Sequence, residues 1–199
     1  ARLHEATQAS LMHLLPWLSW AKAEPISIAA RVSFLRGARA RFDRDEDYTY
    51  KLFDRGEQRM LGMSGLHKRG AAGSLEIGYW IAAGALRQGL CSEATAALTH
   101  TAFAHCRADW IEIHCDADNL ASQAVPRRLG FHLDGVLRRR AITPAGQSRD
   151  TMIWSLFADE LAATPSAKIS YEAFDACGDR MNSRASESHE PTAAISGSE

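Results

Sequence analysis

The sequence predicts an α/β (α+β) fold, with a mixed, mostly antiparallel sheet and flanking helices. Apolar residues recur at helical spacing near the N-terminus, and three alternating segments then follow one another across short turns. A long Ala-rich segment with helical periodicity separates the third of these from a fourth alternating segment. This strand–helix–strand order favours a right-handed crossover, so we expect the third and fourth strands to run parallel.

Two helices are predicted in the first 45 residues. Leu11, Leu14 and Leu18 lie on one face of the first helix. Pro16 interrupts this helix because proline removes a helical hydrogen bond, and the second helix begins after Pro25. The other predicted elements are, in order, strands over 48–54, 59–67 and 74–81, a helix over 91–106, a strand over 110–116, a helix over 118–130, and a hairpin of strands over 131–142 and 151–157.

The length of the chain bounds its organisation. It has 199 residues, of which 46% are hydrophobic, which suffices for one core with at most a tail. We expect one domain over residues 1–159 and a C-terminal extension over 160–199. Residues 168–181 fit helix and strand equally well, whereas 182–199 have the polar composition of a disordered segment.

Composition excludes several classes of protein. No apolar run approaches the roughly 20 residues that span a bilayer, and no N-terminal segment resembles a secretory signal, so we expect a cytoplasmic protein without membrane contact. The 23 basic and 24 acidic residues give no case for direct nucleic-acid binding. The four cysteines form no CxxC pair, so no metal site is expected.

The join between the third strand and the long helix is the first candidate for chemistry. Residues 86–93, LRQGLCSE, lead from a strand into a helix N-terminus, where unpaired N–H groups favour a phosphate or pyrophosphate. Gly89 lets the backbone approach such a ligand, and Arg87 adds positive charge. An ordinary strand-to-helix loop is the alternative, because the run is neither a P-loop nor a GxGxxG fingerprint.

Three segments occur in an order and spacing typical of one family: LEIGYWI (75–81), LRQGLCSEA (86–94) and DADNLASQAVPRRLGF (116–131). They resemble the fourth strand, the pyrophosphate loop and the Asn-x-x-Ser-x-x-Val segment of the GNAT superfamily of acetyl-CoA-dependent N-acetyltransferases. Within that superfamily the resemblance is to the RimJ/RimL-like branch. It covers about residues 3–158.

The resemblance implies a GNAT fold in which the two central parallel strands splay apart and the pantetheine arm of acetyl-CoA lies between them. The implied reaction is direct transfer of the acetyl group to a primary amine, of a protein N-terminus or a small molecule, within a ternary complex. The implied cofactor-binding residues are Trp80, Ile81 and Ala82 on the strand, Arg87, Gln88, Gly89, Leu90, Cys91 and Ser92 in the loop, and Asn119 and Ser122 on the short helix.

Two residues are candidates for proton transfer. Glu76 is the candidate base because it lies near the expected path of the amine, with His114 and Asp116 as alternative bases and a structural role as the other explanation. Ser122 is the candidate acid, since by the resemblance it faces the cofactor sulfur, and helix capping is its other explanation. Pro126 cannot donate to the carbonyl of Ser122, which leaves that carbonyl for another partner.

Aromatic side chains are candidates for the acceptor site. The first helices cover this site in the family, so Trp17, Trp20 and Tyr79 are expected to bind the amine substrate, although aromatics also form cores. Cys91 stands where the family has Gly or Ala, and we expect it to pack rather than to act as a nucleophile. A homodimer is compatible with the resemblance. The alternative function is a non-catalytic acyl-CoA-binding or sensing module.

The sequence departs from the family pattern in two places. Leu86 stands where the loop usually has Gln or Arg, although Arg87 is adjacent. Members also begin with a strand ahead of the first helix, whereas this sequence starts almost within that helix at Ala1. We therefore expect a missing first strand, which residues 168–174 could replace.

Overall fold

The computed structural model describes residues 1–143, 146–175 and 177–181, so the disorder expected over 182–199 lies outside the described residues. The elements in chain order, where η marks a 3₁₀ helix, are α1 (Arg2–Leu14), η1 (Ser19–Ala23), α2 (Ile28–Asp43), β1 (Asp47–Phe53), β2 (Met60–His67), β3 (Ser74–Ile81), η2 (Ala83–Ala85), α3 (Leu90–Ala104), β4 (Trp110–Asp116), α4 (Leu120–Leu129), β5 (His132–Ile142), β6 (Ser148–Phe157), η3 (Ala158–Ala163) and η4 (Pro165–Lys168).

The strands form one six-stranded sheet in the order β1-β2-β3-β4-β6-β5. β3 and β4 are parallel, with α3 as the crossover, and every other neighbouring pair is antiparallel. The predicted fold class is therefore confirmed. The last strand begins at Ser148 rather than at the predicted residue 151, because the hairpin pairing extends out to Ile142.

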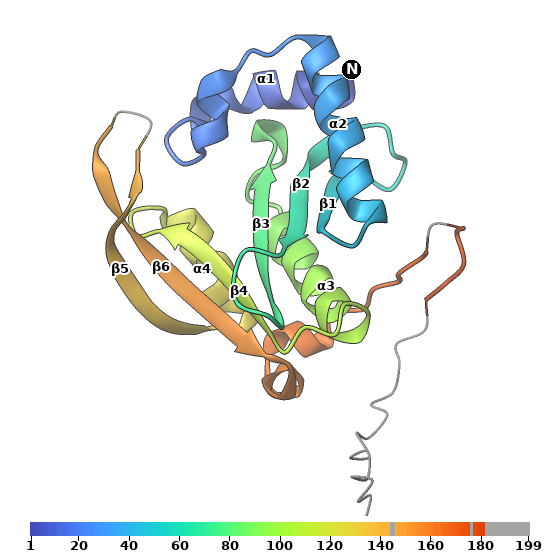
Figure 1. Cartoon of the computed structure of the whole chain (residues 1–199), viewed down its shortest axis with the longest axis vertical. Coiled ribbons are helices and arrows are strands. Elements are labelled where there is room, and N and C mark those ends of the chain that lie inside the picture. The colour runs from blue at the N-terminus through green and yellow to red at the C-terminus, as the bar shows by residue number, and fades with distance from the viewer. Residues whose placement is uncertain (144–145, 176, 182–199) are drawn as a thin grey trace, which may run out of the picture.

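The two parallel strands diverge after a short paired stretch. β3 and β4 are in register only from Ser74, opposite Trp110, to Glu76, opposite Glu112. Beyond this point β3 continues to Ile81 along β2, while β4 continues along β6. Figure 1 shows the two arrows close together at one end and apart at their tips. The sheet thus contains the splay that the family resemblance implies.

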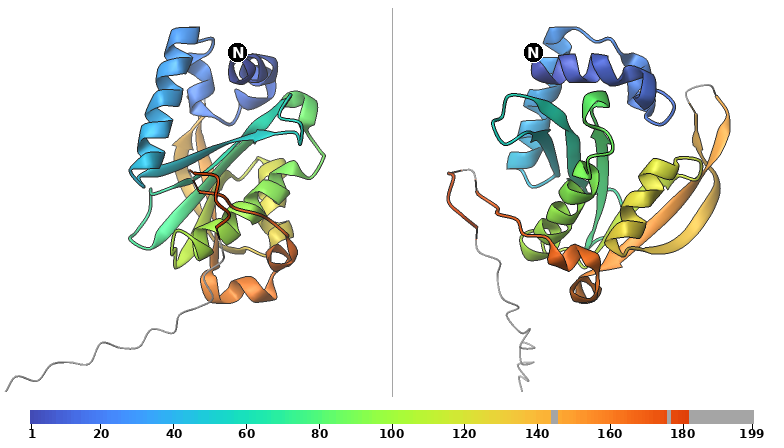
Figure 2. Two further views of the ribbon diagram at one scale, coloured as in Figure 1. Left: turned by 90° about the vertical axis from the view of Figure 1, so that its right-hand side faces the viewer. Right: turned by 180° about the vertical axis from the view of Figure 1, so that it is seen from behind.

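Strand alternation divides the core between the two faces of the sheet. Ile77 and Tyr79 face α3 and α4 and pack into the main cluster of buried side chains. Trp80, next along β3, packs on the opposite face against Leu3 of α1 and Met63 of β2. Figure 2 shows α1 and α2 on one side of the splay, and α3 and α4 on the other. The splay therefore opens between two separately packed layers.

The beginning of the C-terminal extension packs against α3 and α4. Ser166 is fully buried, and its Oγ donates to the carbonyl of Leu129 at 2.9 Å. The carbonyl of Ser166 lies 2.9 Å from Nε2 of His100 in α3. The ring centroids of His100 and Tyr171 are 5.2 Å apart. The division at residue 159 stays a prediction, but this first part of the extension is anchored to the core.

The hypothesis that residues 168–174 replace the family's first strand is wrong. Within the described part of the chain, the pairing of this segment is a single bridge between Phe174 and Arg180, which does not involve the sheet. β1 is the strand at that edge instead. The segment is directed elsewhere because Ser166 and Tyr171 hold it against α3.

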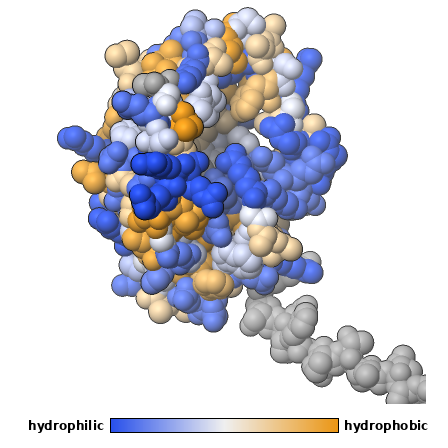
Figure 3. Space-filling view, turned by 60° about the vertical axis from the view of Figure 1, so that its left-hand side comes forward, coloured by the Kyte–Doolittle hydropathy of each residue, from blue (hydrophilic) through white to orange (hydrophobic). Residues whose placement is uncertain are grey.

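The surface is mixed in character. In Figure 3, hydrophilic side chains form a broad band across the visible face, and hydrophobic ones gather beside it. Among the described residues, no helix combines the length and apolar character needed to cross a membrane.

Candidate active site

The loop before α3 leaves the helix N-terminus open. Gly89 is the N-cap, with a left-handed φ of 79°, and among the described residues no side chain caps the helix there. A Cβ at Gly89 would meet no atom of the described residues within 4 Å, so the space that they leave beside it is free. The N–H groups of the first turn have no acceptor within the helix. This arrangement fits a phosphate group, which needs several backbone donors and no obstructing side chain.

The other loop residues divide between solvent and core. Leu86, Arg87 and Gln88 are exposed, so the apolar Leu86 does not block the open helix end. Leu90 and Cys91 pack instead against a buried cluster that includes Ile81. Burial raises the pKa of the Cys91 thiol to about 12, so it stays protonated at neutral pH. This is the behaviour of a packing residue and not of an activated nucleophile.

A hydrogen-bond network bridges the splay on the face of α3 and α4. The hydroxyl of Tyr79 in β3 lies 3.1 Å from the carbonyl of Ser122 and 3.2 Å from its Oγ. Asn119 is the N-cap of α4, and its side-chain oxygen accepts from the N–H of Ser122 at 3.1 Å. Burial raises the pKa of Tyr79, so its phenol remains a neutral donor.

The structure identifies the partner of the Ser122 carbonyl, which the sequence alone did not. Pro126, four residues later inside α4, has no N–H to donate, and the Tyr79 hydroxyl takes that place. Tyr79 is thus directed toward Ser122 within the core.

Ionisable side chains gather on the opposite face, where the splay begins. Oε1 of Glu76 lies 3.1 Å from a guanidinium nitrogen of Arg69, and Oε2 lies 3.7 Å from Nδ1 of His114. Nε2 of His114 lies 2.7 Å from Oε2 of Glu112, whose other oxygen accepts from Trp110. The structure therefore unites Glu76 and His114, which the sequence treated as alternatives.

Sequence reasoning missed Glu112 and Arg69. Strand alternation places Glu112 and His114 on one face of β4, which is a usable signal. Their proximity to Glu76 depends on the register of β3 against β4, which alternation does not give.

A cavity of about 430 Å³ lies where the α1–η1 loop meets the far ends of β4 and β6. Arg149 holds these parts together: its guanidinium donates to the carbonyls of Pro16 and Trp17 at 2.8 and 2.9 Å, and its Nε lies 2.8 Å from a carboxylate oxygen of Asp116. The described residues that line the cavity are Leu15, Pro16, Trp17, Asp116, Asp118, Thr143, Gln147 and Arg149.

Of the three aromatic residues expected at the acceptor site, Trp17 alone lines this cavity. Trp20 packs against Trp80, with 6.1 Å between the ring centroids. No local pattern marked Arg149, because its partners are more than 30 positions away in the sequence.

The end of β3 makes internal contacts at two residues expected to bind the cofactor. The carbonyl of Ile81 lies 3.0 Å from Nε2 of His13 in α1, and the N–H of Ala82 donates to Leu61 at 2.7 Å. These backbone groups already have partners in the protein, whereas the described part of the chain offers no partner to the N–H groups of residues 90–92 at the start of α3.

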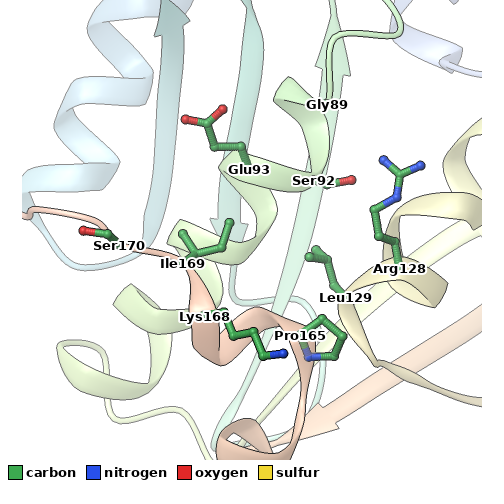
Figure 4. A pocket seen from close by; sticks show the side chains of 9 residues that line it. All are labelled: Gly89, Ser92, Glu93, Arg128, Leu129, Pro165, Lys168, Ile169 and Ser170. Carbon is green, nitrogen blue, oxygen red and sulfur yellow. The ribbon is translucent and has the colours of Figure 1, made fainter.

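A larger cavity of about 600 Å³ begins at the open end of α3. Figure 4 shows it between α3, α4 and the segment around Pro165, with Ser92 and Arg128 directed toward each other. The lining residues are Gly89, Ser92, Glu93, Arg128, Leu129, Pro165, Lys168, Ile169 and Ser170.

Comparisons with known proteins indicate the family to which the chain belongs. A family model described as "Acetyltransferase (GNAT) domain" matches residues 1–132. The curated protein "Probable N-acetyltransferase YjcK" of Bacillus subtilis (strain 168) is 30% identical over 101 residues, 50% of this chain and 56% of that protein. The match therefore spans little more than half the length of this relative.

Solved structures that share the fold include two in complex with coenzyme A or acetyl-CoA. RimL, a ribosomal L7/L12 alpha-N-protein acetyltransferase in complex with coenzyme A, has a TM-score of 0.72 at 23% identity, over 79% of this chain and 87% of that chain. The microcin C7 self-immunity acetyltransferase MccE, in complex with acetyl-CoA and AMP, has a TM-score of 0.69 at 24% identity, over 78% and 85%.

Proposed function

The chain belongs to the GNAT acetyltransferase family, and we propose that it transfers the acetyl group of acetyl-CoA directly to a primary amine within a ternary complex. One observation carries the proposal: the β3–β4 splay, beside an open helix end, has hydroxyl groups on one face and a carboxylate–imidazole cluster on the other. When bound, acetyl-CoA supplies an activated thioester.

The loop residues Arg87, Gln88 and Gly89, with the first turn of α3, bind the pyrophosphate. The left-handed backbone and open space at Gly89 support this role, because a side chain there would narrow the approach to the N–H groups. Cys91 contributes only its backbone, since its side chain packs inward.

Glu76 and His114 remove the proton that the amine carries at neutral pH. Glu76 accepts the proton, and His114, held by Glu112 at 2.7 Å, passes it toward solvent. The His114 side chain is 33% exposed, which supports exchange with solvent at that end of the cluster.

Ser122 returns a proton to the departing thiolate. Its hydroxyl lies 3.2 Å from that of Tyr79, so the phenol orients the serine hydroxyl and forms a short chain of donors with it. The N-cap contact from Asn119 fixes the backbone of Ser122, which supports a positioning role for Asn119.

Two measurements test the proposed acetyl transfer. One is calorimetric titration with CoA, and the other is thiol release from acetyl-CoA in the presence of amines. The acceptor panel begins with peptides bearing free N-termini, because RimL, a protein acetyltransferase by name, shares the fold, and continues with small amines. Thiol release that depends on one acceptor is the expected result. CoA binding without turnover on any amine would favour the sensing module instead.

A further inference from the structure

The cavity at the open end of α3 is closed on one side by the C-terminal extension. Gly89 and Ser92 come from the start of α3, Arg128 from the last turn of α4, and Lys168 from η4. Residues that are 76 positions apart in the sequence, Ser92 and Lys168, thus line one hollow of about 600 Å³. The family model ends at residue 132, so it does not include Lys168.

The cavity has two cations without an anionic partner among the described residues. Arg128 and Lys168 form none of the ion pairs found there, and both side chains are exposed to solvent. Glu93 is the one carboxylate among the described lining residues, and Figure 4 shows it directed away from Arg128. The cavity therefore has an excess of positive charge beside the positive end of a helix.

Lys168 extends from an anchored segment. Ser166, two residues before it, is fully buried and bonded to both Leu129 and His100. Thr164 and Pro165 pack so closely on Gly130 that a Cβ there would lie 2.9 Å from each. Because this backbone is fixed to both α3 and α4, the position of Lys168 relative to the open helix end is also fixed.

We propose that Arg128 and Lys168 bind the 3′-phosphate of the adenosine of coenzyme A, so that the C-terminal extension forms part of the cofactor site. This inference rests on the proposed function, which puts the pyrophosphate at Gly89 and Ser92. The adenosine attached to that pyrophosphate then enters the cavity that these two residues also line. A phosphate monoester carries close to two negative charges at neutral pH, which matches two unpaired cations.

The test compares the dissociation constants of CoA and 3′-dephospho-CoA, measured by calorimetry at one fixed ionic strength because such contacts are screened by salt. Wild-type protein is expected to prefer CoA. Lys168→Gln should weaken CoA binding about tenfold and leave 3′-dephospho-CoA unchanged, since a hydrogen bond between charged groups contributes about that much. Arg128→Gln should act in the same way, and Lys168→Arg should keep the preference.

The matched control is Lys51→Gln, which removes the same charge from an exposed position on β1. It should leave both constants unchanged. Equal weakening of both ligands in Lys168→Gln, or no preference in the wild type, would overturn the proposal while leaving the acetyltransferase assignment intact. Failure of the wild type to bind either ligand would overturn both.

Discussion

The two faces of the β3–β4 splay contain different kinds of chemistry. On the face of α3 and α4, Tyr79, Ser122 and Asn119 form a neutral network. On the other face, Glu76 and His114 belong to a cluster of ionisable side chains. The first set consists of neutral hydrogen-bond donors and acceptors, whereas the second consists of acid–base side chains. Under the proposed function, positioning and proton removal therefore take place on separate layers of the fold.

The largest expected effect comes from filling the open helix end beside the splay. Gly89→Glu should weaken CoA binding about 1,000-fold, roughly 4 kcal/mol, because the side chain puts an anion and bulk at the open end of α3. Calorimetry measures this. Gly146→Glu is the control, since Gly146 also has a left-handed φ, of 83°, with open space around it. Unchanged affinity in Gly89→Glu would refute the loop assignment.

Glu76→Gln removes the proposed base from the ionisable face. We expect kcat at neutral pH to fall about 100-fold, because the amide cannot accept the proton of the amine. The loss should shrink as the pH rises, since the amine then loses its proton to solvent. A pH–rate profile with the acceptor found in the panel measures both effects, and Glu5→Gln, at an exposed position in α1, is the matched control. A loss that is equal at every pH would assign Glu76 a structural role.

Ser122→Ala removes the proposed acid from the neutral face and should lower kcat less than Glu76→Gln does. A thiolate leaves readily because thiols are moderately acidic, so we expect kcat to fall only about tenfold. The dissociation constant of CoA should change less than threefold. Tyr79→Phe keeps the ring and removes the 3.2 Å contact with Ser122, and it should reproduce part of this loss. Normal turnover in Ser122→Ala would remove Ser122 as the acid.

The smallest effect at neutral pH concerns Cys91, which packs against the same core cluster as Tyr79. Its pKa rises from 9.0 to about 12 on folding, so the unfolded chain loses this proton first as the pH increases. The contribution of the protonated thiol to the free energy of unfolding is therefore complete below pH 9. It is lost between pH 9 and 12, by at most about 1.4 kcal/mol per pH unit. Urea unfolding of wild type and Cys91→Ala across this range measures the difference. Parallel pH dependences would show that the thiol is not buried as described.

The neutral face was more predictable than the ionisable one, for a physical reason. The missing N–H at Pro126 is a local property of the chain, so the sequence predicted a free carbonyl at Ser122. The partner, Tyr79, is 43 residues away and needed the structure.

The ionisable cluster and the anchored extension depend on long-range packing. Glu76 meets His114 only because of a three-residue parallel register, and Arg149 joins parts of the chain more than 130 residues apart. Alternation and helical periodicity specify which side of an element a residue faces, but not which element lies opposite. For the same reason the sequence did not predict that Ser166 would be buried between α3 and α4.

Pro126 affects both the stability of α4 and the hydrogen bond between Ser122 and Tyr79. A proline inside a helix costs about 3 kcal/mol of helix stability relative to alanine. Pro126→Ala would restore a donor for the Ser122 carbonyl along the helix axis, in competition with the hydroxyl of Tyr79. A substitution that strengthens the isolated helix would thereby loosen its link to β3. Under the proposed role of Ser122, selection for thermal stability and selection for turnover would therefore favour different residues at position 126.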